Sequence, residues 1–415
     1  MKNWYLLGVM LGLTIPSLAF QVFQRTGVLD LSLHPFLSAP LFGIAIVGSA
    51  FLLAWATEVS ELDIPQGLAI AFVALIAVLP EYAVDFYLTW EAGQNPDGPY
   101  VHYAAANMTG SNRLLVGLGW PMVALLFWIR ERRTLKVGKA LSLELLFLSA
   151  ATVYSFTIPF KSSIALFDSV VLVALFAVYI WLSSKGKHEE PTLVGPSKAI
   201  GNLPTTSRRL LTAFLFIWAA FIIIVSAKPF AEGLLSLGVT VGLDEFLLVQ
   251  WIAPLASESP ELLIASVFTV RGMSGAAITT LVSAKVNQWT LLVGTLPIVY
   301  SLSLGETAHL PLDLRQNQEF LLTSAQSLFA VVLIVHMYLS WRGATILLFL
   351  FGVQLLSPLY PNWGLGPLDI QDRLLYVIVY FIATITLLTS DRTRIRQLVA
   401  LGPAVYKARI RREEV

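Results

Sequence analysis

Two proline–glutamate pairs lie near the middle of long apolar segments, in Leu79-Pro80-Glu81 and in Ser259-Pro260-Glu261. A charged side chain at the centre of a bilayer costs about 2.5–3.5 kcal/mol on insertion scales, and such residues mark functional sites. A proline inside a helix also removes a backbone hydrogen bond and frees a carbonyl one turn earlier, here near Ile76 and Ala256. Two such pairs, in corresponding places of two halves, predict a site for cations.

The residues around these pairs could complete a shell of oxygen ligands. Calcium takes six to eight oxygens at about 2.3–2.6 Å. Glu81 and Asp85 lie four apart, and Glu258 and Glu261 three apart, so each pair shares one helix face. The following segment of each half adds neutral oxygens at the same spacing. The predicted ligands are Glu81, Asp85, Asn107, Ser111, Glu258, Glu261, Thr279, Ser283 and Asn287.

A structural role is the alternative for each of these residues. Glu81 and Glu261 could be anchors hydrogen-bonded across helices, and Asn107 and Ser111 could pack helices together. Asp85 and Glu258 have no counterpart in the other half, so they could support the ligands or form ion pairs instead.

Two basic residues, Arg113 and Lys285, stand inside or beside the same polar segments. They are predicted to balance charge: four carboxylates and two basic side chains leave −2 if all face one cavity. Such a cavity could hold one calcium ion, two monovalent ions or protons. A purely structural pairing of Arg113 and Lys285 with carboxylates is the alternative.

The composition is that of a membrane protein. The chain has 415 residues, of which 56% are hydrophobic and 13% charged, with a mean hydropathy of +0.74, whereas soluble domains carry roughly a quarter charged residues. Apolar runs of about twenty residues predict an all-α polytopic fold of about twelve transmembrane helices. The predicted segments are 4–24, 36–58, 66–90, 100–128, 140–158, 163–183, 210–236, 244–270, 274–302, 319–340, 343–360 and 371–390.

Several function classes find no support in the sequence. The absence of cysteine excludes disulfides and thiolate metal sites. No resident cofactor is expected. The five histidines are scattered, and no zinc-protease, nucleophile-elbow, phosphate-loop or dinucleotide motif is present. We expect neither an enzyme nor a nucleic-acid partner; the expected partners are inorganic cations and the lipid bilayer, and the oligomeric state stays open.

Lysine and arginine in short loops predict the orientation. Basic clusters fall at 129–139, 184–209 and 391–415, all on one side of a twelve-helix arrangement. This predicts that both termini are cytoplasmic. The expected location is the plasma membrane. The first segment resembles a signal peptide, since Met1-Lys2 precedes a short apolar core, but we expect it to remain as a helix. For the tail around Val399 and Tyr406, contact with anionic lipid and an unstructured solvated state both remain open.

The loop at 184–209 divides the chain into two sets of five helices, with one extra helix at each end. Because five is odd, the second set must be inverted in the membrane, which is the plan of many transporters. The predicted parts are an extra helix (1–35), a first repeat (36–183), a cytoplasmic loop (184–209), a second repeat (210–360), an extra helix (361–390) and a basic tail (391–415).

The two halves resemble the inverted repeats of the cation/calcium exchanger superfamily. Asn107-Met108-Thr109-Gly110-Ser111-Asn112 is similar to the second element of that family's repeat, and the two Pro-Glu pairs are similar to the end of the first. Aligning Ser111 with Ser283 pairs Asn107 with Thr279 and Arg113 with Lys285. The departures are Ala77-Val78 in place of small hydroxyl residues, Glu258 beside the second pair, and the two basic residues.

The resemblance implies a secondary active antiporter that moves calcium or another cation against sodium or protons, by alternating access at a carboxylate site in mid-membrane. The alternative on the same fold is a sodium/proton exchanger, which the two basic residues favour. A passive channel or a membrane scaffold is the reading from a different class; a channel would need no counter-ion.

Overall fold

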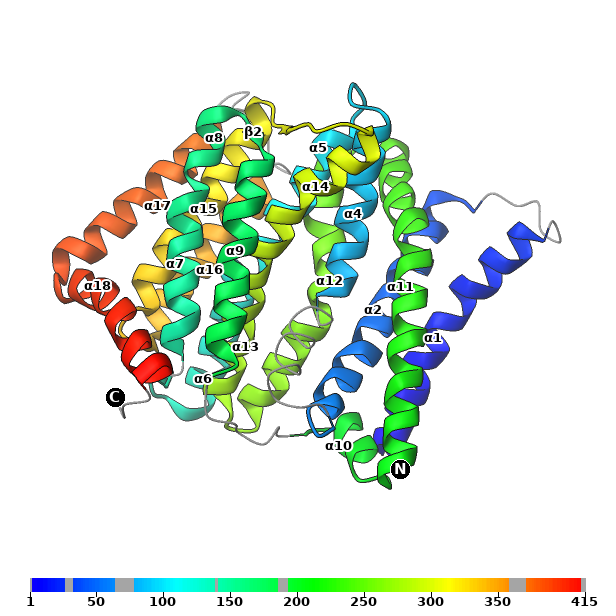
Figure 1. Cartoon of the computed structure of the whole chain (residues 1–415), viewed down its shortest axis with the longest axis horizontal. Coiled ribbons are helices and arrows are strands. Elements are labelled where there is room, and N and C mark those ends of the chain that lie inside the picture. The colour runs from blue at the N-terminus through cyan, green and yellow to red at the C-terminus, as the bar shows by residue number, and fades with distance from the viewer. Residues whose placement is uncertain are drawn as a thin grey trace. The chain divides into compact units, whose positions relative to one another are not determined.

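The computed structural model describes residues 2–26, 33–63, 78–138, 141–185, 193–357 and 371–411. Its elements are almost entirely helices, as Figure 1 shows, so the prediction of an all-α fold is confirmed. Each of the twelve predicted segments contains a helix, although 66–90 is described only from Val78 onward and Ile76 and Ala77 lie outside the described residues.

The chain is an integral membrane protein. Among the described residues, seven helices are long and apolar enough to cross a membrane. They are Lys2–Arg25, Pro35–Ser60, Tyr100–Glu131, Ser142–Lys161, Leu166–Ser183, Thr205–Val241 and Arg373–Ser390, and the shorter apolar helix Trp341–Leu356 adds to them.

The helices form two compact units, and each unit consists of two separate segments of the chain. Unit 1 consists of Met1–Leu88 and Ser184–Pro260, and unit 2 of Thr89–Ser183 and Glu261–Val415. Helices α4 (Leu79–Gln94) and α12 (Glu245–Val270) contribute to both. Each unit contains residues from both halves of the chain. The predicted domain bounds therefore describe the sequence repeats and not these compact units. Those bounds stay a prediction.

Unit 1 is built on the long contact between α2 (Pro35–Ser60) and α11 (Thr205–Val241), with α1 (Lys2–Arg25) and the short α10 (Pro196–Gly201) against α2. Glycine permits the close approach: a Cβ on Gly233 would lie 2.9 Å from the backbone nitrogen of Ala39. Near the other end, Leu52, Ala56 and Ile223 belong to one buried cluster. This helix pair therefore packs backbone against backbone as membrane helices do.

Helix α11 is longer than predicted, because it begins five residues before the apolar run expected at 210–236 and ends five residues after it. Its 37 residues exceed the roughly twenty that a bilayer requires. The extra first turn carries Arg208, which donates two hydrogen bonds of 2.8 Å to the Asp63 carboxylate, and Arg209, which donates one of 2.9 Å. Asp63 follows α2, so this ion pair ties the end of α2 to the start of α11.

Unit 2 is arranged around α15 (Leu314–Ile334), which packs against α5 (Tyr100–Leu114), α7 (Ser142–Ser155) and α17 (Gln371–Ser390). Its other helices are α6 (Trp120–Glu131), α8 (Thr157–Lys161), α9 (Leu166–Ser183), α13 (Ser274–Asn287), α14 (Val293–Leu304), α16 (Trp341–Leu356) and α18 (Thr393–Tyr406), with π-helical turns η1 (Leu115–Gly119), η3 (Gln288–Leu292) and η5 (Lys407–Arg411). Nearly every side chain of α15 from Phe320 to Ile334 is buried. This helix is therefore the centre of the unit.

Two short antiparallel strand pairs close unit 2. Strand β1 (Leu135–Lys136) pairs with β4 (Tyr338–Leu339), and β2 (Ser163–Ile164) pairs with β3 (Leu310–Pro311). Helices α7 and α8 separate β1 from β2 along the chain. Within unit 2, the loop at 129–139 thus contacts the segment that precedes Arg342. Which side of the membrane is cytoplasmic stays a prediction.

A buried charge cluster connects α15 to two other helices of unit 2. Glu319 of α15 forms ion pairs with Arg113 of α5 at 2.5 Å and with Arg373 of α17 at 2.6 Å. The side chains of Glu319 and Arg113 are only 4% and 2% exposed. A buried carboxylate between two guanidinium groups fixes the rotation of both helices about their own axes.

Replacing Asp63 by asparagine should lower the stability of unit 1. The hydrogen bonds from Arg208 and Arg209 hold the pKa of Asp63 at about 2, below its ordinary value. The carboxylate therefore stabilises the fold at pH values above about 4 and loses this effect as the pH falls toward 2. We expect Asp63→Asn to lower the free energy of unfolding by about 1–2 kcal/mol at neutral pH, measured by denaturant unfolding in detergent. Arg208→Gln should cost more than Arg209→Gln, and equal losses would contradict the assignment.

Replacing Glu319 by glutamine should destabilise unit 2 more strongly. Two buried guanidinium groups would lose their shared counter-charge, which costs about 3–5 kcal/mol for a buried pair. Thermal unfolding of the purified protein measures the loss, and Glu131→Gln, in the more exposed pair with Arg133, is the matched control. The double variant Glu319→Gln/Arg373→Gln should be less destabilised than the sum of the two single variants. A Glu319→Gln protein as stable as the control would refute the role of the cluster.

Candidate functional site

The first Pro-Glu pair opens α4. Pro80 stands in its first turn, where a missing N–H does no harm, and Glu81 lies at the end of the helix that favours negative charge. Glu81 and Asp85 are 2% and 0% exposed. Tyr87 of the same helix donates to Glu232 of α11 at 3.1 Å, which ties this part of α4 to α11 within unit 1. Both predicted carboxylates are thus carried by a helix that is held in place by its neighbour.

The second Pro-Glu pair lies inside α12, which contains both Pro254 and Pro260. Pro260 cannot donate to the carbonyl of Ala256, and the hydroxyl of Ser259 donates to that oxygen instead, at 3.0 Å. The carbonyl that we expected to be freed therefore has a side-chain donor. Glu258 is buried, whereas Glu261 is half-buried.

Helix α5 carries the polar motif of the first half entirely within buried surface. Asn107 and Ser111 are 1% and 0% exposed. The Ser111 hydroxyl donates to the carbonyl of Asn107 at 2.8 Å, and the Asn112 amide donates to that of Met108 at 2.8 Å. A hydroxyl that donates its hydrogen bond to the backbone keeps its oxygen lone pairs available, and such an oxygen can act as a cation ligand.

Helix α13 presents the matching residues of the second half less uniformly. Thr279 and Ser283 are half-buried and Asn287 is buried. Tyr179 of α9 donates its hydroxyl to Ser283 at 3.2 Å, so the Ser283 oxygen already has one protein partner in unit 2.

A π-helical turn follows the polar motif in both halves, which the sequence analysis did not anticipate. The order α5, η1, α6 is repeated by α13, η3, α14, with five residues in each π-helical turn. Such turns add a residue to the helix and often mark functional sites. Within the first of these turns, a Cβ on Gly117 would lie 2.2 Å from a ring carbon of Phe351, so α16 packs closely against η1.

The structure gives both basic residues partners in unit 2. Lys285 donates to the side-chain oxygen of Asn112 at 2.7 Å and to its carbonyl at 3.2 Å, and its ammonium lies 4.4 Å from the centre of the Trp289 ring. Arg113 pairs with Glu319, which is not among the four predicted carboxylates. This supports a structural role, the alternative left open for these residues, while their contribution to charge balance at a cation site stays a prediction.

The sequence did not predict three of the residues in these contacts. They are Glu319, Arg373 and Asn112. The predicted segment began at residue 319 and so placed Glu319 at a helix end, but α15 begins at Leu314, after a capping box formed by Asp313 and Gln316. That box, Asp-x-x-Gln before an apolar run, is the signal that would have extended the helix and buried Glu319.

The predicted ligands divide between the two units. Glu81, Asp85 and Glu258 belong to unit 1, and the other six belong to unit 2. Their assembly into one cation site therefore stays a prediction. Within unit 2, the structure joins the two polar helices through Lys285 and Asn112.

Comparison with known proteins identifies the same family as the motifs. The model of the family "Sodium/calcium exchanger protein" matches residues 34–185 and 211–360. Among curated proteins, no sequence matches the chain significantly.

Three solved structures illustrate the likeness. The crystal structure of the H+/Ca2+ exchanger CAX is 42% identical, with a TM-score of 0.90, and the match covers 100% of both chains. The structure of native YfkE is 14% identical with a TM-score of 0.62, covering 84% of this chain and 99% of the other. The sodium-calcium exchanger NCX_Mj is 17% identical with a TM-score of 0.52, covering 78% and 99%, and both of these share the fold. With both halves matched by the family model, this chain belongs to the sodium/calcium exchanger protein family.

Proposed function

We propose that this chain is a secondary active antiporter that exchanges calcium for protons. The observation that carries the proposal is the full-length match, at 42% identity, to an H+/Ca2+ exchanger. We further propose the predicted arrangement for this chain: repeats at 36–183 and 210–360, a plasma-membrane location and cytoplasmic termini.

Carboxylates suit this exchange because protons and calcium compete for the same oxygens. Glu81 and Glu261 can each hold one proton, and release of two protons leaves the two negative charges that one Ca²⁺ neutralises. Either occupant leaves the pair without net charge, which is the condition for a buried site to move between the two membrane faces at low cost. The empty, doubly charged pair is costly in the membrane, so calcium crosses in one direction and protons in the other.

Neutral oxygens would complete the calcium shell. Asn107 and Ser111 on α5 and Thr279, Ser283 and Asn287 on α13 offer amide and hydroxyl oxygens at one-turn spacing. Two carboxylates supply two to four oxygens, so two or more of these groups are needed to reach six. Asp85 and Glu258 are the further carboxylates that could bind the ion directly or hold the ligands in place.

Lys285 and Arg113 act in this proposal as anchors of the polar helices. Lys285 crosses from α13 to Asn112 of α5, and Arg113 crosses from α5 to Glu319 of α15. These contacts tie α5 to α13 and to α15 within unit 2.

Sodium/proton exchange is the second candidate, and the buried Lys285 favours it. Lys285 is 0% exposed, and its ammonium group contacts Asn112 in the polar motif of α5. A fixed positive charge there lowers the negative charge left for the substrate, which favours a monovalent ion over calcium.

Replacing Glu81 or Glu261 by glutamine should abolish calcium uptake. Glutamine keeps the shape but can neither carry the charge nor release a proton, so we expect uptake to fall at least a hundredfold, on the scale of one lost charge–ion contact. Calcium-45 uptake into proteoliposomes with an acidic interior measures it, with Asp97→Asn, in an exposed loop, as the matched control. Uptake at the wild-type rate in both glutamate variants would refute the site.

The coupling ion can be tested in the same vesicles. A pH gradient, acid inside, should drive calcium uptake and raise the internal pH as calcium enters, whereas a sodium gradient at equal pH should drive none. Uptake driven by sodium alone would replace protons as the coupling ion. Calcium flux without any counter-ion gradient, and without proton movement, would point to a channel, and sodium/proton exchange that calcium leaves unaffected would favour the second candidate.

A further inference from the structure

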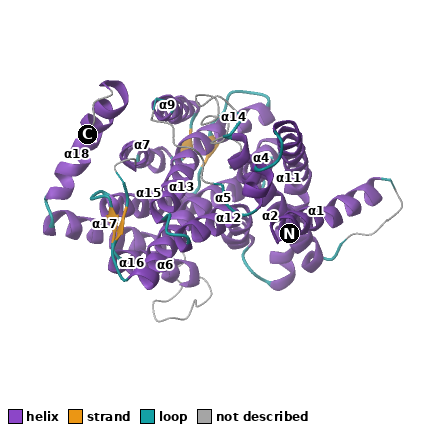
Figure 2. Cartoon of the chain, turned by 90° about the horizontal axis from the view of Figure 1, so that it is seen from below, coloured by secondary structure: helices purple, strands orange, loops and turns teal. Residues whose placement is uncertain are grey.

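The C-terminal segment forms an ordered helix that begins at once after a membrane-spanning one. Helix α17 ends at Ser390 and α18 begins at Thr393. Because α17 is long and apolar enough to cross the bilayer, the start of α18 must lie near one bilayer surface. Figure 2 places α18 at the outer edge of unit 2. The unstructured tail considered above is therefore not what the structure shows.

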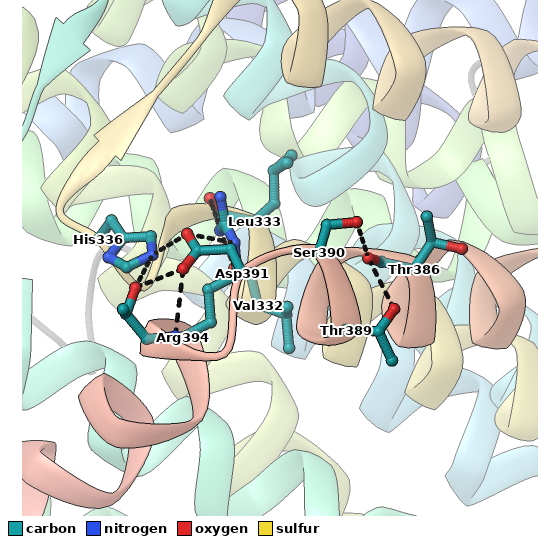
Figure 3. A network of polar contacts seen from close by, with 9 residues as sticks. Val332, Leu333, His336, Thr386, Thr389, Ser390, Asp391 and Arg394 are labelled. Atoms are coloured by element: carbon teal, nitrogen blue, oxygen red, sulfur yellow. Dashed lines mark hydrogen bonds and ion pairs between the residues drawn. The ribbon is translucent and has the colours of Figure 1, made fainter.

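A network of polar contacts fixes the turn between the two helices (Figure 3). The Arg394 guanidinium donates to the carbonyls of Val332 at 2.6 Å and Leu333 at 3.1 Å, at the end of α15. His336 Nε2 lies 2.8 Å from a carboxylate oxygen of Asp391, which precedes α18. The bonds from Arg394 satisfy two carbonyls at the end of α15 that have no partner within the helix. Together with the contact of His336 they hold α18 to α15, the centre of unit 2.

One face of α18 is buried against the protein. Arg394, Leu401 and Val405 are 8%, 3% and 4% exposed, and α18 packs against α7. Their spacing of seven and four residues places them on a single face of an α-helix. Most of the other residues of α18 are exposed.

A second face of α18 is apolar and exposed. Ile395, Val399 and Tyr406 are 48%, 72% and 51% exposed, and Ile410 in η5 is 43% exposed. At about 100° per residue, the first three lie within about 40° of one another and roughly 120° from the buried face. Monomeric proteins in water rarely leave such a stripe uncovered.

A basic face adjoins the apolar stripe. Arg396 and Lys407 lie about 60–120° beyond the stripe, and Arg392 and Arg411 flank it at the two ends. All four side chains are exposed, and residues 392–411 contain no Asp or Glu. An apolar stripe beside a basic face, at the end of a spanning helix, matches a helix that lies in the headgroup region of a bilayer.

We propose that α18 and η5 form a binding surface for anionic phospholipid headgroups of the surrounding bilayer. Ile395, Val399, Tyr406 and Ile410 enter the boundary between headgroups and acyl chains, while Arg396, Lys407 and Arg411 contact the lipid phosphates. Each basic residue near an anionic leaflet raises partitioning about fivefold, so three of them contribute on the order of a hundredfold. This surface is independent of the proposed exchange activity.

Spin-label depth measurements test this on the full-length protein. The chain contains no cysteine, so Val399→Cys gives a single labelling position without background. In nanodiscs of phosphatidylcholine mixed with phosphatidylglycerol, the label should be accessible to oxygen and shielded from a water-soluble nickel chelate. Gln397→Cys, exposed on the opposite side of α18 from Val399, is the matched position and should stay accessible to the chelate. A label at 399 that the chelate reaches as freely as at 397 in this mixture would overturn the proposal.

The charge requirement has its own controls. Replacing phosphatidylglycerol by phosphatidylcholine, raising the salt concentration, or introducing Arg396→Gln/Lys407→Gln/Arg411→Gln should each move the label toward water, whereas Arg396→Lys/Arg411→Lys should not. Depth that is unchanged by lipid charge, salt and the glutamine variant would reject phosphate recognition and leave only apolar insertion. Inorganic phosphate added to pure phosphatidylcholine should not restore the depth; restoration would point to a free-anion site instead. Should the glutamine variant fail to fold, the lipid and salt comparisons on the single-cysteine protein decide alone.

Discussion

A charged or polar group inside the apolar part of a membrane protein must find its partner within the protein, because hydrocarbon offers none. The arrangement of unit 2 follows from this requirement. Lys285 and Arg113 could not be carried on α13 and α5 unless Asn112 and Glu319 stood where they do. Because Glu319 also holds Arg373, the position of α15 is fixed with respect to two helices at once.

The two halves of the chain share the same order of helices but give their buried basic side chain different partners. Both polar helices end in a π-helical turn, and both carry a basic residue shortly before it. Arg113 pairs with the carboxylate of Glu319, whereas Lys285 contacts the amide oxygen of Asn112 and the ring of Trp289. A repeat can therefore preserve its geometry while the chemistry at equivalent positions diverges, which is what allows one half of an exchanger to specialise.

Much of the fold was predictable, since hydropathy and length decide where a membrane helix lies. The twelve apolar runs and the motif with Asn107 and Ser111 led to the fold and the family. Sequence reasoning failed where the answer depended on a partner distant in sequence. Nothing near Arg113 indicates that its carboxylate lies more than two hundred residues away, and the shorter span assumed for α15 hid Glu319. The π-helical turns were missed for a different reason: a single extra residue in a helix leaves the apolar pattern almost unchanged.

The salt bridge between Glu319 and Arg373 has a consequence for what counts as the core of this protein. The family model ends at residue 360, and Arg373 lies beyond it, in a helix that the repeat plan treats as an addition. Yet this helix provides one of the arginines that pair with the buried Glu319, which also holds Arg113 at the end of the first polar motif. A minimal version trimmed to the two repeats would keep every predicted ligand and still lose electrostatic support within its interior. The family match therefore leaves out a helix on which a buried ion pair in the interior of unit 2 depends.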